Sequence, residues 1–104
     1  MRLWLDDVRP KPDGYSKHVK TAKEAVCALK TGEYTGISFD HDLGDEIIYG
    51  CGYEVAKWIE EMAFLGKIAR LEWLVHSANP VGRARISSAM YKAEEYWNNH
   101  EENR

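Results

Sequence analysis

Three short polar motifs, each at the end of an apolar run, carry most of the side chains that could do chemistry in this chain. They are Leu5-Asp6-Asp7-Val8-Arg9-Pro10, Asp40-His41-Asp42-Leu43-Gly44 and His76-Ser77-Ala78-Asn79-Pro80. Together they supply four carboxylates, two imidazoles, an arginine and a hydroxyl. Such a set suits phosphate chemistry, in which carboxylates hold a cation, imidazoles move protons and a guanidinium binds the anion.

The aspartates of the first two motifs are candidates for a divalent-cation site. A hard cation such as Mg²⁺ binds one or two carboxylates together with water and phosphate oxygens. We therefore expect Asp6, Asp7 and Asp42 to hold Mg²⁺ or another divalent cation, and no other cofactor. Asp40 is expected beside them as a catalytic group. In the alternative interpretation, Arg9 and the histidines neutralise these acids by ion pairing.

His41 and His76 are the candidate acid–base pair. His41 stands between two aspartates, which can fix the tautomer of an imidazole, and we assign it the acid role. His76 follows an apolar run and precedes polar residues, and we assign it the base role. The plainer alternatives are a surface imidazole for His41 and a core histidine for His76. His18 and His100 are expected to be bystanders.

Arg9, Ser77, Asn79 and Arg83 are the candidate phosphate ligands. Asn79 is expected to cap a helix that begins at Pro80, and the N-terminus of a helix attracts anions. Arg83 follows Asn79 by about one helical turn, so its side chain can point back toward the helix start. The plainer alternative is an ordinary helix start that binds no anion.

Alternating strands and helices must position these motifs. Apolar patterning predicts strands at about 2–6, 16–20 (a short edge strand), 36–39 and 71–75. Helices are predicted at 21–32, at 53–65 and from 80 onward. The segment Thr21-Ala22-Lys23-Glu24 is a capping box at a helix start. We expect 44–52 to be a loop and the polar tail, 98–104, to be frayed.

This order of elements predicts an α/β fold of one domain spanning 1–104. We expect a three-layer sandwich around a mostly parallel sheet, truncated to about four strands and three helices. The last helix is predicted to bury Ile86, Met90, Ala93 and Trp97. Because the carboxyl ends of parallel strands share one edge of the sheet, the three motifs should meet there.

Composition narrows the functional classes. A net charge of −3 argues against an extended nucleic-acid-binding face. Cys27 and Cys51 lack metal-type spacing and are expected to be free thiols. No apolar run approaches the length of a membrane span, and the first residues become acidic too early for a signal peptide. We therefore expect a cytoplasmic protein without a membrane partner.

The motifs resemble those of response-regulator receiver domains. In receivers an acidic pair after the first strand binds Mg²⁺, a central aspartate is phosphorylated, and a Ser or Thr contacts the phosphoryl group. The resemblance places Asp6 and Asp7, then Asp40 and Ser77, in those positions. Gly44 stands where a receiver has proline.

The fuller strings around these residues are more similar to the cyclic-phosphate processing receiver-like domain family, from residue 3 to about 90. This resemblance implies a receiver- or flavodoxin-like sheet and a role on cyclic phosphate groups. Together with the candidate pair His41 and His76, it predicts a small phosphoesterase with a two-histidine site. The implied partner is a nucleotide or an RNA end that carries a 2′,3′-cyclic phosphate. One alternative is a protein that binds or sequesters such ligands without turnover. Another is a degenerate receiver that acts as a protein-interaction module.

Overall fold

A computed structural model describes residues 1–102, which form four strands and four helices. The strands are β1 (Arg2–Leu5), β2 (Lys17–Val19), β3 (Gly36–Phe39) and β4 (Glu72–Val75). The helices are α1 (Ala22–Leu29), α2 (Glu46–Tyr49), α3 (Gly52–Phe64) and α4 (Pro80–Glu102). All strand pairs are parallel, in the order β2-β1-β3-β4. The predicted receiver-like α/β fold with a four-stranded sheet is confirmed.

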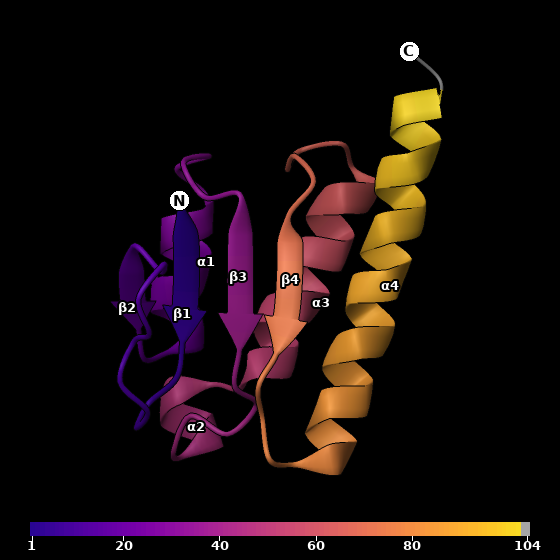
Figure 1. Cartoon of the computed structure of the whole chain (residues 1–104). Coiled ribbons are helices and arrows are strands. Elements are labelled where there is room, and N and C mark those ends of the chain that lie inside the picture. The colour runs from indigo at the N-terminus through magenta and orange to yellow at the C-terminus, as the bar shows by residue number, and fades with distance from the viewer. Residues whose placement is uncertain (103–104) are drawn as a thin grey trace.

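The layers differ from the expected sandwich in one respect. In Figure 1, α1 and α3 lie behind the sheet, and α4 runs beside the β4 edge. Within residues 1–102 the opposite face of the sheet carries no helix. The connection between β1 and β2 is too short for one, and it contributes Tyr15, which packs edge-on against Trp4 with ring centroids 5.1 Å apart. That face is therefore covered by a loop, and only in part.

The core lies between the sheet and the helices behind it. Alternate residues of β1, Leu3 and Leu5, are fully buried, as is Phe39 of β3. Burial of such apolar side chains supplies most of the stability of a domain of this size. The residues predicted to form the inner face of the last helix are all buried, namely Ile86, Met90, Ala93 and Trp97.

Both predicted helix caps are present. The Thr21 hydroxyl accepts the backbone N–H of Glu24 at 3.1 Å, so the side-chain half of the capping box forms. Asn79 Oδ1 accepts the backbone N–H of Gly82 at 3.0 Å, at the start of α4. The motif at 76–80 is therefore held at the end of the helix that follows it.

Two sequence expectations are wrong. The segment 44–52 is not a simple loop, because Asp45 caps the short helix α2 through the backbone N–H of Ile47. The predicted tail is not frayed over 98–102, because α4 continues to Glu102. The guanidinium of Arg70 stabilises this last turn through Glu101 at 2.7 Å. Residues 103–104 lie outside the described residues.

None of the helices in the described part of the chain combines the length and the apolar character that crossing a bilayer requires.

Candidate functional site

Three carboxylates meet at the carboxyl ends of β1 and β3. One oxygen from each of Asp6, Asp7 and Asp40 lies within 4.8 Å of the other two. The register explains this, because Leu5 of β1 lies opposite Phe39 of β3 and the next residues follow side by side. Three oxygen donors at this separation match the ligand set of a hard divalent cation.

Asp6 is the fixed member of this cluster. Its side chain is fully buried, and its Oδ1 accepts the backbone N–H groups of Val8 at 2.8 Å and Arg9 at 2.7 Å. Its Oδ2 lies 2.9 Å from Nε2 of His76. Burial alone would raise the pKa of Asp6, but these hydrogen bonds outweigh burial and hold that pKa below its ordinary value. Asp6 is therefore a carboxylate at neutral pH.

Asp40 shows the opposite shift. Burial raises its pKa, and the nearby carboxylate of Asp6 raises it further. The backbone N–H of His41, 2.8 Å from Oδ1, and the hydroxyl of Ser77 offset this only in part. Like charges held this close favour a proton or a cation between them. The electrostatics of the cluster therefore fit a divalent cation.

His76 has no free ring nitrogen for the predicted base role. Nδ1 lies 2.7 Å from the hydroxyl oxygen of Ser38, and Nε2 lies 2.9 Å from Asp6. The ring also stacks on Trp4 with centroids 3.9 Å apart and planes 3° from parallel. Burial lowers the pKa of His76 despite the neighbouring Asp6 and Asp40. A neutral ring fits this network when Nε2–H donates to Asp6 and Nδ1 accepts from Ser38. We therefore correct the base assignment: His76 positions Asp6.

Asp6, His76 and Ser38 form a hydrogen-bonded chain with the residue types of a nucleophilic triad. The serine, however, is not accessible to a substrate. The side chain of Ser38 is only 1% exposed. Ser38 lies opposite Trp4 in the β1–β3 register, so the two side chains share one face of the sheet. A nucleophile must reach its substrate, so this serine anchors the imidazole rather than attacking.

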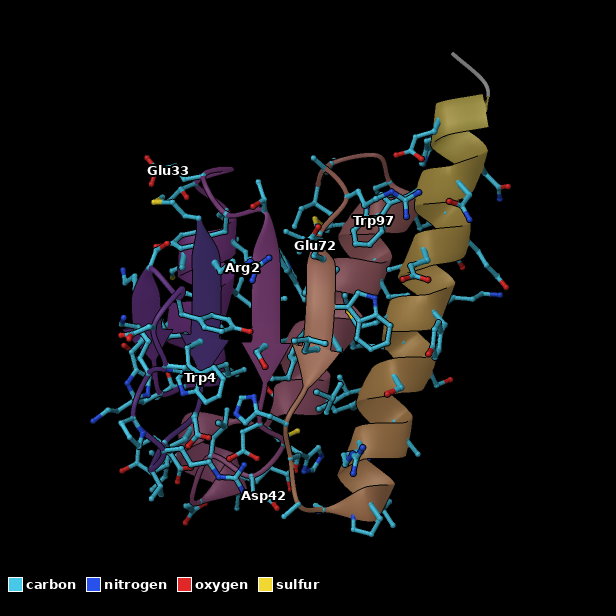
Figure 2. The ribbon with its side chains drawn as sticks, viewed as in Figure 1. Arg2, Trp4, Glu33, Asp42, Glu72 and Trp97 are labelled. Atoms are coloured by element: carbon cyan, nitrogen blue, oxygen red, sulfur yellow. The ribbon has the colours of Figure 1, made fainter. Side chains whose placement is uncertain are left out.

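His41 belongs to a separate network. Its Nδ1 lies 2.9 Å from Asp42, while its Nε2 is buried and has no hydrogen-bond partner within residues 1–102. Asp42, labelled at the lower edge of Figure 2, also lies 3.4 Å from the side-chain amide of Asn79. Its carboxylate thus faces His41 and α4, whereas Asp40 occupies the place in the acidic cluster that we predicted for Asp42.

The ring of His41 packs directly on Gly82 in the first turn of α4. A Cβ at Gly82 would lie 2.3 Å from Cγ of His41, far closer than van der Waals contact. We therefore expect Gly82→Ala to lower the free energy of unfolding by about 1–3 kcal/mol through overpacking, although alanine favours helix. Ser88→Ala, at an exposed position of the same helix, is the control, and urea denaturation measures both. Unchanged or increased stability in Gly82→Ala would contradict this packing.

Of the four predicted phosphate ligands, two lie beside the acidic cluster, one caps a helix and one lines a groove. Arg9 donates from Nη1 to the carbonyl of His76 at 2.8 Å, and Ser77 hydrogen-bonds to Asp40, so both lie beside the acidic cluster. Asn79 is occupied with the helix cap. Arg83 lines a groove between β4 and α4 instead, with Val75 among the other lining residues.

Three contributors to the site were missed by sequence reasoning: Trp4, Ser38 and His18. His18, predicted to be a bystander, lies with Nε2 2.7 Å from the carbonyl oxygen of Asp6. Trp4 and Ser38 are directly opposite in the β1–β3 register, on the same face of the sheet. The period of two along a strand could have indicated that face, but not which strands are neighbours.

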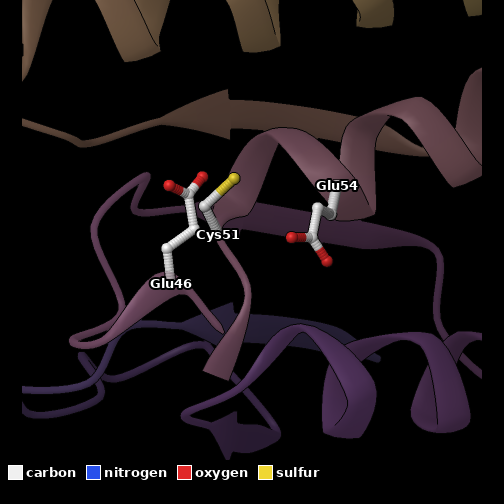
Figure 3. Close-up of side chains that lie close together, drawn as sticks. All are labelled: Glu46, Cys51 and Glu54. Carbon is white, nitrogen blue, oxygen red and sulfur yellow. The ribbon is translucent and has the colours of Figure 1, made fainter. Parts of the chain in front are cut away.

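A second cluster lies at the start of α3. One ligand atom each from Glu46, Cys51 and Glu54 lies within 4.8 Å of the others, and Figure 3 shows the carboxylate of Glu46 next to the thiol of Cys51. Burial raises the pKa of the Cys51 thiol, and its hydrogen bond to Glu46 raises it further. The thiol is therefore protonated and donates to Glu46. Cys27 and Cys51 are both free, as predicted.

Stability is expected to fall when the pH is lowered from neutral, because the fold holds His76 neutral. The imidazole has an ordinary pKa of 6.5, and burial lowers it in the folded chain. The contribution of the neutral imidazole to the free energy of unfolding is therefore complete above about pH 6.5. It is lost as the pH falls toward and through the pKa of His76 in the folded chain. Urea unfolding at about pH 7.5 and about pH 5.5 should show this loss in the wild type and in His100→Gln, but much less in His76→Gln. The raised pKa of Asp40 opposes the loss in all three proteins, and most in His76→Gln, where His76 no longer lowers that pKa. Equal losses in both variants would contradict this.

The parallel sheet, the acidic cluster beyond β1 and β3, and the serine after β4 define a receiver-like domain. Within that class, the chain matches the family described as the cyclic-phosphate processing receiver domain over residues 1–92, and it belongs to this family. Neither the curated proteins nor the solved structures contain a match to the chain.

Proposed function

We propose that this domain binds a cyclic phosphate group, on a nucleotide or an RNA 3′ end, and hydrolyses one of its ester bonds with the aid of a divalent cation. The observation that carries the proposal is the convergence of Asp6, Asp7 and Asp40 within 4.8 Å. Membership of the cyclic-phosphate processing receiver family supports the ligand class.

Asp6 and Asp7 would hold the cation, because all their donor atoms are carboxylate oxygens, which Mg²⁺ prefers. When bound, the cation supplies Lewis-acid stabilisation of the charge on the phosphate. The orientation of Asp6 is maintained by the backbone N–H groups of Val8 and Arg9 and by His76, which in turn is anchored by Ser38. Preorganised ligands of this kind lose little freedom when they bind.

In the proposed hydrolysis, Asp40 accepts a proton from the attacking water. The water oxygen forms a bond to phosphorus, the bond from phosphorus to one ring oxygen breaks, and that oxygen takes a proton from solvent. Arg9 would bind a phosphate oxygen, which is supported by the hydrogen bond from its Nη1 to the carbonyl of His76 beside the cluster. The hydroxyl of Ser77, which hydrogen-bonds to Asp40, orients the base.

The test is hydrolysis of 2′,3′-cyclic CMP and of a short RNA with a cyclic 3′ end, followed by ³¹P NMR. We expect a phosphate monoester to form with Mg²⁺ and none with EDTA. Calorimetric binding of the cyclic nucleotide without product would show a ligand-binding protein and refute the hydrolytic step. The absence of both binding and turnover would refute the whole proposal.

A further inference from the structure

A groove of about 570 Å³ runs along the outer edge of β4. One wall is the continuous segment 70–75, which includes all of β4. The other wall is a single stripe of α4, made of Arg83, Ser87, Tyr91 and Glu94. These residues are three or four positions apart and so share one face of the helix. Figure 1 shows α4 running beside this edge along the whole strand.

The strand wall of the groove presents backbone groups without partners in the sheet. On the side that faces β3, the backbone N–H of Glu72 donates to the carbonyl of Thr35, just before β3, at 2.9 Å. The backbone N–H of His76 donates to the carbonyl of Phe39 in β3, also at 2.9 Å. Because successive N–H groups of a strand point in opposite directions, those of Trp73 and Val75 point away from β3. Within residues 1–102, β4 is the last strand of the sheet on that side. A strand edge with unpaired backbone groups, here facing α4 across the groove, can pair with another extended segment.

The centre of the groove is formed by two aromatic side chains and by Glu94, whose carboxylate accepts the indole N–H of Trp73 at 2.9 Å, and one end of the groove is positively charged. Trp73 and Tyr91 pack edge-on with centroids 5.1 Å apart, yet Tyr91 is still 61% exposed. Arg70, at the amino end of β4, is paired with Glu101. Arg83, toward the carboxyl end, has no ion pair or side-chain hydrogen bond to any residue in 1–102. The groove therefore has an uncompensated cation near the carboxyl end of β4.

We propose that this groove binds an extended peptide segment of a partner protein, which adds to β4 as a parallel strand. The segment matches β4 in length, about four residues. Its backbone pairs with Trp73 and Val75, an apolar side chain packs on Trp73 and Tyr91, and an acidic residue at its carboxyl end pairs with Arg83. Backbone pairing supplies the affinity and these side-chain contacts supply the specificity. This function is separate from the acidic cluster.

The test begins with selection of random heptapeptides displayed on phage against the full chain, with counter-selection against Val75→Pro. Proline removes an outward-facing N–H without breaking a bond to β3, so the variant should fold. We expect enriched peptides with alternating apolar residues and an acidic residue near the carboxyl end. An enriched peptide, synthesised with a fluorescent label, should bind the wild type saturably in an anisotropy titration.

Affinity for that peptide should fall at least tenfold in Val75→Pro and in Arg83→Glu, and remain unchanged in Arg85→Glu. Arg85 lies on the same helix but stacks on Tyr53, so it is a matched charge-reversal control. Circular dichroism confirms that each variant is folded. Failure to enrich peptides, or equal affinity in Arg83→Glu and the wild type, would overturn the proposal. A dimer of the wild type that Val75→Pro dissociates would also overturn it, because a second copy would then occupy the edge.

Discussion

Asp7→Asn is expected to abolish cation-dependent hydrolysis of the cyclic nucleotide, lowering kcat/KM by about a hundredfold or more. A metal ion stabilises the transition state by several kcal/mol, and each loss of about 1.4 kcal/mol is a factor of ten in rate. The asparagine would keep the size of the side chain but remove the negative charge that holds the cation. Because Asp7 is only half-buried and Asp6 carries the structural hydrogen bonds, the stability of the fold should change by less than about 1 kcal/mol.

The measurements are turnover of 2′,3′-cyclic CMP and calorimetric titration with Mg²⁺ or Mn²⁺. Asp13→Asn is the matched control, since Asp13 is an exposed aspartate in the same connection between β1 and β2. It should leave both cation affinity and turnover unchanged. Wild-type cation affinity in Asp7→Asn would remove Asp7 from the proposed ligand set.

Asp6→Ala is expected to lower the free energy of unfolding by about 3 kcal/mol, because leaving a buried hydrogen-bond donor without its acceptor costs about 1–3 kcal/mol. The substitution leaves the backbone N–H groups of Val8 and Arg9 and the Nε2 of His76 without their acceptor. Asp7→Ala, one residue further along, should cost less than about 1 kcal/mol because that side chain is partly exposed. Asp6 would thus contribute to stability as well as to cation binding, whereas Asp7 would contribute to cation binding with little effect on stability.

Urea denaturation at about pH 7.5 compares these variants, above the range in which His76 titrates. Asp6→Asn provides a graded control, because its amide oxygen can still accept the two backbone N–H groups. It should lie between the wild type and Asp6→Ala. If Asp6→Ala unfolded within about 1 kcal/mol of the wild type, the buried network would contribute little to stability.

The fold could be predicted because its signals are local. Thr21 and Asn79 are helix caps whose partners are three residues away, and the apolar stripe ending at Trp97 repeats at the helical period. The short helix α2 escaped prediction because none of its residues is buried, and Ile47 is 97% exposed. With no apolar face turned to the core, the segment has no helical periodicity. The last turns of α4 contact Arg70, a partner far away in sequence, through Asn98 and Glu101.

The convergence of aspartates at the strand ends could be predicted, although Asp42 was expected where the cluster contains Asp40. Asp6, Asp7 and Asp40 follow neighbouring strands, and parallel topology brings them together. The role of His76 could not be predicted, because it depends on Ser38, which lies across the sheet. The position of Arg83 depends on the rotation of α4 about its axis. The spacing of residues along a helix determines which side chains are neighbours on that helix. It does not determine which part of the rest of the protein those side chains face.

The strand order β2-β1-β3-β4 has a consequence for the chain as it leaves the ribosome. β1, synthesised first, is an inner strand, and its partner on one side, β3, ends only at Phe39. Parallel pairing over such separations forms slowly, because the intervening chain must be ordered first. The carboxylate of Asp6 stays without its imidazole partner until His76 has emerged. The nascent chain therefore carries an Asp6 without its imidazole partner until β4 and His76 have been made, and the buried network is completed only then.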